Sequence, residues 1–357
     1  MAETLRLILF CLSSVYRVAI RIRNQAFDCG LKHAHQVDAT VISVGNLTAG
    51  GTGKTPFVIW LAGQLERTRA VAVVSRCYGA QYCRLNDEGL EIRQRLPAVT
   101  QVQDPDRVAA AQQAISEMSP RQAAANLPLR PVVLLDDGFQ HRRLARDLDI
   151  LLIDSIRPFG FGFLLPRGLL REPIQSVKRA NLAVLTRANL VDDSKREAIR
   201  KQLLLHHPRL KLAEAELVTE HWLAADQQQY PLERLLGKRL FAFCGIGNPE
   251  GFLDTLQHAG MNVVECLEFD DHHRFRPDDI QSVGARAEQS HCDAIVCTHK
   301  DLVKLDFQLT GRLPIYALLT TVRISQGEDL VTAVIRDALA KLEDAGRNES
   351  AEALPHG

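Results

Sequence analysis

The chain has 357 residues, of which 46% are hydrophobic, so it is long enough for two domains with cores of their own. Lysine plus arginine and aspartate plus glutamate both total 43, and this balance excludes a broadly basic surface for nucleic acid. The cysteines form no Cys-x-x-Cys pair, which is typical of reduced thiols in a cytoplasmic protein.

The N-terminal segment combines an apolar run with basic residues. Residues 7–16 carry no charge, and four basic residues follow them: Arg17, Arg21, Arg23 and Lys32. This run is about half of the ~20 residues that cross a bilayer. We expect residues 1–35 to form a hydrophobic and basic helix that lies in a membrane surface. A helix packed on the protein's own core explains the pattern equally well.

From residue 41, short runs rich in β-branched residues alternate with longer amphipathic segments, which predicts βαβ units. The expected strands cover residues 41–44, 71–74, 132–135, 150–153, 182–185, 239–244 and 294–297. The expected helices cover residues 54–67, 107–118, 194–206 and 330–342. We therefore predict an α/β fold of the P-loop NTPase type, with a mostly parallel sheet flanked by helices and a second, smaller α/β lobe.

A change of composition between Lys211 and Gly237 predicts the boundary between the two lobes. We expect the P-loop core over residues 36–215 and the smaller C-terminal lobe over residues 216–343. The polar residues that follow predict a disordered tail over residues 344–357.

A glycine-rich loop joins the first strand of the core to its first helix. Glycines let backbone N–H groups surround phosphate oxygens, and the helix N-terminus adds its positive end. Lys54 would reach the β- and γ-phosphates of a nucleotide triphosphate, and Thr55 would offer its hydroxyl to Mg²⁺. Thr48 stands where the usual pattern has glycine, so the loop is a variant. The residues expected to hold the nucleotide are Ala49, Gly50, Gly51, Thr52, Gly53, Lys54 and Thr55.

Three other segments carry candidate functional groups. Asp136 and Asp137 follow the strand over residues 132–135, where carboxylates hold Mg²⁺ well. The loop over residues 164–173, stiffened by proline and glycine, is either part of a substrate pocket or a structural loop. The segment over residues 270–273 places histidines beside carboxylates, as proton transfer requires. A surface turn or a metal site explains that segment equally well.

With these motifs in hand, the chain resembles the lipid A 4′-kinases, also called tetraacyldisaccharide 4′-kinases, from about residue 5 to 345. The resemblance rests on an ordered set of motifs: Val44-Gly45-Asn46, Gly51-Thr52-Gly53-Lys54-Thr55-Pro56, Val74-Ser75-Arg76, Asp136-Asp137-Gly138-Phe139-Gln140-His141, Leu165-Pro166, Leu170-Arg171-Glu172-Pro173, Gly245-Ile246-Gly247-Asn248-Pro249, Asp271-His272-His273, Lys300-Asp301 and Lys304-Leu305. Thr48 is also what the loop of that family looks like.

The resemblance implies transfer of the γ-phosphoryl group of ATP to the 4′-hydroxyl of a tetraacylated glucosamine disaccharide 1-phosphate, a lipid A precursor. It implies ATP and Mg²⁺ as cofactors, a two-lobed molecule with the nucleotide in its cleft, and an N-terminal helix on the cytoplasmic face of the inner membrane. We also expect a monomer that binds no nucleic acid.

The resemblance also assigns roles to single residues. The Gly-Asp-Glu-Pro motif of the family appears here as Asn86-Asp87-Glu88-Gly89, which makes Asp87 the candidate base and His272, in preference to His273, its partner. The catalytic set is then Asp87, His272 and Lys54. The metal would be held by Thr55, Asp136, Asp137 and Gln140. The residues expected at the substrate are Arg76, His141, Arg171, Glu172 and His273.

Two other functions compete with this interpretation. A membrane-associated P-loop ATPase or switch protein that phosphorylates no lipid explains the loop and Asp136, but it leaves Asp87 and His272 without a role. A cytosolic small-molecule kinase leaves the apolar, basic N-terminus unexplained.

Overall fold

The computed structural model describes residues 2–76, 85–124, 130–305 and 311–352, which belong to two compact units. Unit 1 comprises Met1–Cys83, Leu96–Glu216 and Val322–Gly357, and unit 2 comprises Arg84–Arg95 and Leu217–Thr321. The change of unit after Glu216 lies one residue from the boundary expected between residues 215 and 216. Two other parts of the division differ from the expected lobes over residues 36–215 and 216–343. A short segment around Asp87 joins unit 2, and the chain returns to unit 1 along its last strand and helix.

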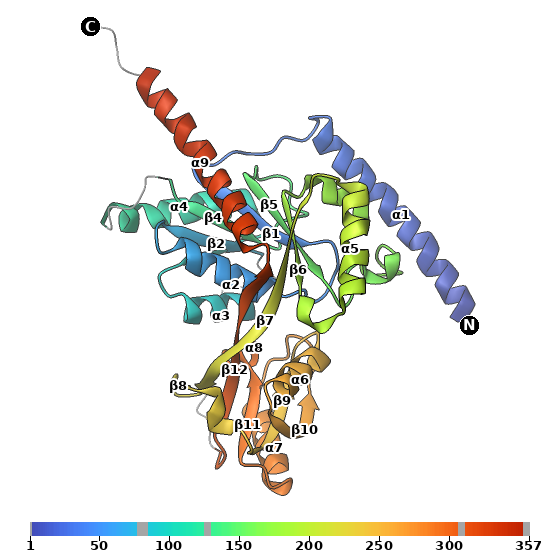
Figure 1. Ribbon diagram of the computed structural model, residues 1–357, viewed down its shortest axis with the longest axis vertical. Coiled ribbons are helices and arrows are strands. Elements are labelled where there is room, and N and C mark those ends of the chain that lie inside the picture. Colours follow the sequence, from blue (N-terminus) through green and yellow to red (C-terminus); the bar gives the residue numbers. More distant parts are fainter. Residues whose placement is uncertain (1, 77–84, 125–129, 306–310, 353–357) are drawn as a thin grey trace. The chain divides into compact units, whose positions relative to one another are not determined.

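The sheet of unit 1 is parallel throughout, in the order β7-β6-β5-β1-β4-β2-β3 (Figure 1). Every residue of β1, β2, β4, β5 and β6 is buried, because helices cover the sheet and the strands are apolar runs. The prediction of a mostly parallel sheet is confirmed. The strand bounds are β1 Thr40–Asn46, β2 Val71–Ser75, β3 Thr100–Gln103, β4 Val132–Asp136, β5 Leu148–Asp154, β6 Leu182–Thr186 and β7 Lys211–Ala224.

Helices pack on this sheet through apolar side chains. Helix α2 contacts β1, β2 and β4, and α4 contacts β2, β3 and β4. Val41, Val74 and Val133 of the strands share one buried cluster with Met118 of α4. The bounds are α1 Ala2–Asp28, α2 Lys54–Leu65, α4 Arg107–Ala124, α5 Asp193–His206 and α9 Glu328–Glu352.

Helix α9 continues through most of the segment expected to be a disordered tail. Its composition is polar, but alanine, glutamate and arginine are good helix formers, so polarity alone does not end a helix. Residues 353–357 of that expected tail lie outside the described residues.

Unit 2 has a sheet in the order β10-β9-β11-β12, also parallel, and β8 pairs antiparallel with β7. Asn248 caps α6 by accepting a hydrogen bond from the Gly251 N–H at 3.4 Å, and Pro249 is the first residue of the helix. The bounds are β8 Gln229–Tyr230, β9 Arg239–Cys244, β10 Asn262–Glu268, β11 Ala294–Thr298, β12 Ile315–Gln326, α3 Asp87–Arg95, α6 Pro249–His258, α7 Pro277–Gln289 and α8 His299–Leu302.

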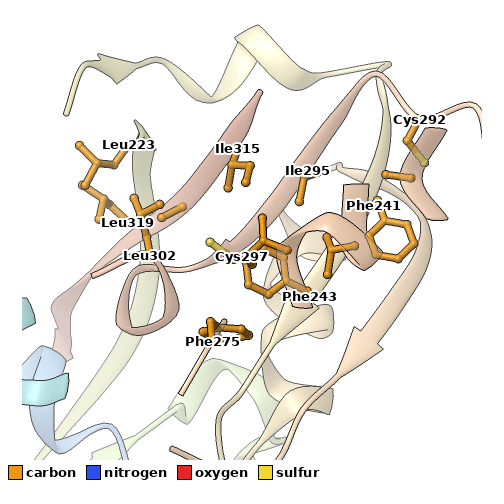
Figure 2. Close-up of a cluster of buried hydrophobic side chains, with 14 residues drawn as sticks. Leu223, Phe241, Phe243, Phe275, Cys292, Ile295, Cys297, Leu302, Ile315 and Leu319 are labelled. Carbon is orange, nitrogen blue, oxygen red and sulfur yellow. The ribbon is translucent and has the colours of Figure 1, made fainter. Parts of the chain in front are cut away.

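The two faces of the unit 2 sheet have separate cores because side chains alternate along a strand. Phe241 and Phe243 of β9 pack with Ile295 and Cys297 of β11 in one cluster (Figure 2). Val283 of α7 belongs to the same cluster. The alternate residues of β9 pack with α6 on the other face. The two layers hold the ends of β9 and β11, and therefore the loops that follow them, in fixed positions.

Helix α1 packs on unit 1 by one side. The Ser13 hydroxyl donates a hydrogen bond to the Leu164 carbonyl at 2.9 Å, and the Tyr16 hydroxyl donates to the Arg171 carbonyl at 3.0 Å. On the rest of the helix, large apolar residues are half or more exposed, including Leu5, Ile8, Leu12, Val15 and Ile22. The interpretation of residues 1–35 as a helix packed on the protein's own core holds for this one side, and contact of the exposed side with a membrane stays a prediction. Among the described helices, none has an apolar stretch long enough to span a bilayer.

Candidate active site

The glycine-rich loop runs from the end of β1 to the start of α2 and is tied to neighbouring elements. The Asn46 amide donates to the Thr52 hydroxyl at 2.9 Å, and the Thr186 hydroxyl at the end of β6 donates to the Thr52 carbonyl at 2.9 Å. Gly53 has a φ of 78°, in the left-handed region that side chains disfavour. These features leave the first N–H groups of α2 at a fixed position, as an anion site requires.

Lys54, the first residue of α2, lies beside the carboxylates that follow β4. Its Nζ atom is 3.7 Å from Oδ1 of Asp137, and Nη1 of Arg171 is 2.6 Å from the other oxygen of Asp137. Burial opposes ionisation of Asp137, but the two positive charges outweigh burial and hold its pKa below the ordinary value. Asp136 is buried at the end of β4. Unit 1 thus brings Lys54, Asp137 and Arg171 together.

One other predicted residue of unit 1, Glu172, has different surroundings from those expected. Glu172 was expected at the substrate, but its side chain is fully buried. It pairs with Arg179 at 2.8 Å and Arg23 at 3.5 Å, and it accepts a hydrogen bond from Asn24 at 3.1 Å. Glu172 therefore ties α1 to the core of unit 1 and has no surface left for a headgroup.

Gln140 and His141 lie in the loop after β4, and Arg76 directly follows β2. The Gln140 amide nitrogen donates to the Asn46 carbonyl at 2.8 Å, and both Gln140 and His141 line a cavity beside α1. Burial, followed by the charges of nearby arginines, lowers the pKa of His141 to about 4, so its ring is neutral at pH 7. Arg76 is exposed directly after β2.

In unit 2 the structure brings Asp87 and His272 together. Asp87 is the first residue of α3, and the Asn86 side chain caps this helix by accepting a hydrogen bond from the Gly89 N–H at 2.9 Å. Nδ1 of His272 lies 3.1 Å from Oδ2 of Asp87. His272 itself has a φ of 62°, which is uncommon for a residue other than glycine and frequent at functional sites.

His273 turns away from Asp87. Its Nε2 atom is 3.1 Å from Oδ2 of Asp279, and its ring stacks on Phe269 at a centroid distance of 4.7 Å. Phe275 contacts the same ring edge-on at 5.1 Å. The partner of Asp87 is therefore His272, and His273 belongs to the packing of its own loop.

A buried ion pair lies next to Asp87 and was not assigned a role from the sequence. Nζ of Lys304 is 2.7 Å from Oδ1 of Asp301 and 3.9 Å from Oδ2 of Asp87. Asp301 is fully buried, and it accepts a hydrogen bond from the Thr298 hydroxyl at 2.6 Å. A charge this buried is costly unless it is paired. The spacing of Asp301 and Lys304, three residues apart after a strand, was the signal that could have revealed this pair.

His299, at the start of α8, contacts the helix that begins at Asp87. Its ring is buried, with Nδ1 3.3 Å from Oε1 of Glu91 and Nε2 2.7 Å from Oε1 of Gln94. Both partners lie on α3, so His299 helps to hold the helix that begins at Asp87.

Known proteins are similar to this chain over most of its length. A sequence model of the family described as tetraacyldisaccharide-1-P 4′-kinase (LpxK) matches residues 5–340. The tetraacyldisaccharide 4′-kinase of Halothermothrix orenii is 37% identical over 325 residues, which cover 84% of this chain and 83% of that protein. The protein of the same name from Syntrophus aciditrophicus is 35% identical over 360 residues, covering 93% of each chain.

A solved structure is similar as well. The crystal structure of LpxK from Aquifex aeolicus in complex with ATP matches with a TM-score of 0.72 and 28% sequence identity. The match covers 94% of this chain and 99% of that one.

Proposed function

Since this chain belongs to the family of tetraacyldisaccharide-1-P 4′-kinases, we propose that it transfers the γ-phosphoryl group of ATP to the 4′-hydroxyl of a tetraacylated glucosamine disaccharide 1-phosphate, a lipid A precursor. The observation that carries the proposal is the family match over residues 5–340. Two groups of residues support it: Lys54 with Asp137 at the glycine-rich loop, and Asp87 with His272 in unit 2. Phosphoryl transfer asks mainly for positioning and charge neutralisation, which such groups supply.

The glycine-rich loop and Lys54 bind the phosphates of ATP in this proposal. The hydroxyl of Thr55 and the carboxylates of Asp136 and Asp137 are oxygen ligands, which suit Mg²⁺ in nucleotide sites. The ionised state of Asp137, held by Lys54 and Arg171, fits a cation ligand. When bound, Mg²⁺ neutralises negative charge on the phosphates. Arg171 supplies a further positive charge at the other oxygen of the Asp137 carboxylate.

Asp87 acts as the general base. Its other carboxylate oxygen, Oδ1, accepts the proton of the 4′-hydroxyl while the hydroxyl oxygen forms the new bond to the γ-phosphorus atom, and the bond to ADP breaks. His272 holds the carboxylate in position through Nδ1. Lys304 keeps a positive charge 3.9 Å from the same carboxylate. The base therefore belongs to a pre-arranged set and not to a single exposed side chain.

The exposed apolar residues of helix α1 support the proposal that the protein acts at a membrane surface. Its exposed apolar residues surround the side that packs on unit 1, and Phe161 in the neighbouring turn is 70% exposed. Exposed apolar side chains of this number are uncommon on a freely soluble protein and mark a surface that another apolar phase covers. We place the enzyme on the cytoplasmic face of the inner membrane, where an acylated substrate resides.

The proposal is tested by following labelled phosphate. Wild-type protein is incubated with γ-labelled ATP, Mg²⁺ and the acylated disaccharide 1-phosphate in detergent micelles, and the Lys54→Ala variant is the negative control. We expect label in the lipid with wild type and loss of most of it with the variant. ATP hydrolysis that is independent of lipid, with no labelled lipid, would instead identify an ATPase or switch protein.

The membrane surface is tested with paired surface variants. Ile8→Ser combined with Leu12→Ser removes two exposed apolar side chains from α1, while Leu205→Ser removes one that is 77% exposed on α5. We expect the α1 variant to lose most of its flotation with vesicles, and the α5 variant to float like wild type. Equal flotation of all three proteins would exclude α1 as the membrane-binding element.

A further inference from the structure

The end of strand β6 contacts the glycine-rich loop through two consecutive residues. The Thr186 hydroxyl donates a hydrogen bond to the Thr52 carbonyl at 2.9 Å. The next residue, Arg187, donates from Nη2 to the Gly51 carbonyl at 3.0 Å. Two neighbouring carbonyls of the loop are therefore each held by a side chain from the end of β6. Arg187 was not assigned a role from the sequence.

Arg187 is itself held by Asp154, the last residue of β5. Oδ2 of Asp154 lies 2.5 Å from Nη2 of Arg187, and the side chains of the two residues are only 8% and 14% exposed. Asp154 is the register partner of Thr186, so β5 and β6 end at the same edge of the sheet. Arg187 has a φ of 55°, a conformation that a residue other than glycine keeps only where its contacts fix it. The guanidinium group therefore has a defined position beside the loop.

The two held carbonyls also fix the direction of the N–H groups that follow them. A peptide group is planar and trans, so its carbonyl and its N–H group point in opposite directions. The Gly51 carbonyl shares a peptide group with the Thr52 N–H, and the Thr52 carbonyl shares one with the Gly53 N–H. Because the carbonyls point towards the end of β6, these N–H groups point away from it.

Both N–H groups are available to a ligand. Among the residues that the structure describes, neither Thr52 nor Gly53 donates its backbone N–H to another group of the protein. Gly53 has a φ of 78°, and consecutive N–H groups at a residue in this conformation form a concave site for anions. Helix α2 begins at the next residue and adds its positive end. The two N–H groups thus suit a phosphate oxygen.

We propose that Arg187 positions the Thr52 N–H for the phosphates of the nucleotide, as Thr186 positions the Gly53 N–H. The inference rests on the proposed function for its ligand, ATP. Arg187 contacts the loop and not the nucleotide, so it is a positioning residue. Without its contact, the peptide group between Gly51 and Thr52 is free to rotate, and the N–H group loses its fixed direction.

The test measures ADP binding by calorimetry without lipid, so it does not depend on phosphoryl transfer. Arg187→Met removes the donor but leaves the Asp154 carboxylate without its arginine. Combining it with Asp154→Asn removes that charge, and the asparagine oxygen can still accept the hydrogen bond from the Ile156 N–H. Arg187→Lys keeps a cationic donor. Arg323→Met is the matched control, because it removes an arginine that pairs with Glu216 instead.

Arg187→Met should bind ADP about tenfold more weakly than wild type and should melt at a lower temperature. The double variant should recover the melting temperature but not the affinity, whereas Arg187→Lys should keep the affinity within about threefold. Arg323→Met should bind ADP like wild type. In amide NMR spectra, ADP should shift the Thr52 N–H signal of wild type and shift it much less in the double variant.

Two results would overturn the proposal. Recovery of both melting temperature and ADP affinity in the double variant would show that Arg187 only pairs with Asp154. Equal ADP affinity of Arg187→Met and Arg323→Met would show that the contact with the loop has no effect on the nucleotide. The labelled-ATP assay reports separately on the proposed function, because wild type that binds ADP but labels no lipid would contradict the kinase activity alone.

Discussion

Nδ1 of His272 lies 3.1 Å from Oδ2 of Asp87, although the two residues are 185 positions apart in the chain. The next residue, His273, makes the corresponding contact with Asp279 instead. Two adjacent histidines thus serve different carboxylates. One carboxylate begins helix α3 and is a candidate base, and the other lies in the first turn of α7.

The two histidines provide a matched pair for mutation. His272→Ala should lower kcat by about 10–100-fold, because Asp87 loses the group that orients it. This loss is smaller than the 10²–10⁴-fold that general acid–base catalysis typically contributes, since the base itself remains. His273→Ala should leave kcat within about threefold and lower the melting temperature, because aromatic ring contacts stabilise by roughly 0.5–1.5 kcal/mol. Steady-state kinetics and thermal unfolding check both. The opposite pattern would assign the catalytic contact to His273.

Two variants distinguish a structural role of Lys304, pairing with Asp301, from an electrostatic role beside Asp87. Lys304→Met leaves Asp301 buried without its partner, which should cost about 3–5 kcal/mol. Combining it with Asp301→Asn should recover most of this stability, since the buried charge is gone. We expect kcat of the double variant to stay low, because the positive charge beside Asp87 is still missing. Recovery of both stability and kcat would show that Lys304 is structural alone.

Replacement by alanine should have opposite effects on stability at two glycines, one in α2 and one in the loop before it. Gly53 has a φ of 78°, so Gly53→Ala should cost roughly 1–2 kcal/mol and weaken ATP binding. Gly63 lies inside α2, and a Cβ atom there would be 3.6 Å from Leu96, an ordinary contact. Gly63→Ala should therefore stabilise by up to about 1 kcal/mol and leave ATP binding unchanged. Urea unfolding measures the stability of the two variants, and nucleotide titration measures their affinity for ATP. Equal effects of the two substitutions would contradict the left-handed conformation of Gly53.

His141 should make stability fall with acidification. Its pKa is about 4 in the folded protein, against an ordinary value of 6.5, so between these values the unfolded chain binds more protons. Its contribution is full above pH 6.5 and is lost as the pH falls towards 4. In phosphate-free buffer, wild type should therefore lose more melting temperature between pH 7.5 and 5 than His141→Gln. Equal losses would mean that His141 titrates normally.

The local parts of the fold were readable from the sequence. Three of the four residues in the run 41–44 are β-branched and apolar, and they lie on both faces of the strand, which few structures other than a buried parallel strand accept. The glycine-rich loop was readable because Gly53 occupies a backbone conformation that other residues disfavour. Strand β7 was missed: its residues were interpreted only as a boundary between lobes. The chain does pass from unit 1 to unit 2 there, between Glu216 and Leu217, but a strand runs through these residues.

The remainder depends on contacts between distant parts of the chain. No local pattern shows that Asp87 belongs with residues after 217, or that α9 returns to the first unit. Glu172 looked like a pocket residue because its loop contains proline and glycine, but its burial arises from Arg23 and Arg179, which lie elsewhere in the chain. The identity of a candidate residue was thus predictable, whereas its partners were not.

The role of Asp87 as the general base is tested most directly by the turnover number of the Asp87→Asn variant with saturating ATP and lipid. The substitution keeps the shape of the side chain and its hydrogen bond to His272 but removes the basic oxygen. We predict that kcat falls by 10²–10⁴-fold, the range typical of general-base catalysis, while the KM for ATP changes little. A fall smaller than about tenfold would contradict the assignment of Asp87 as the base.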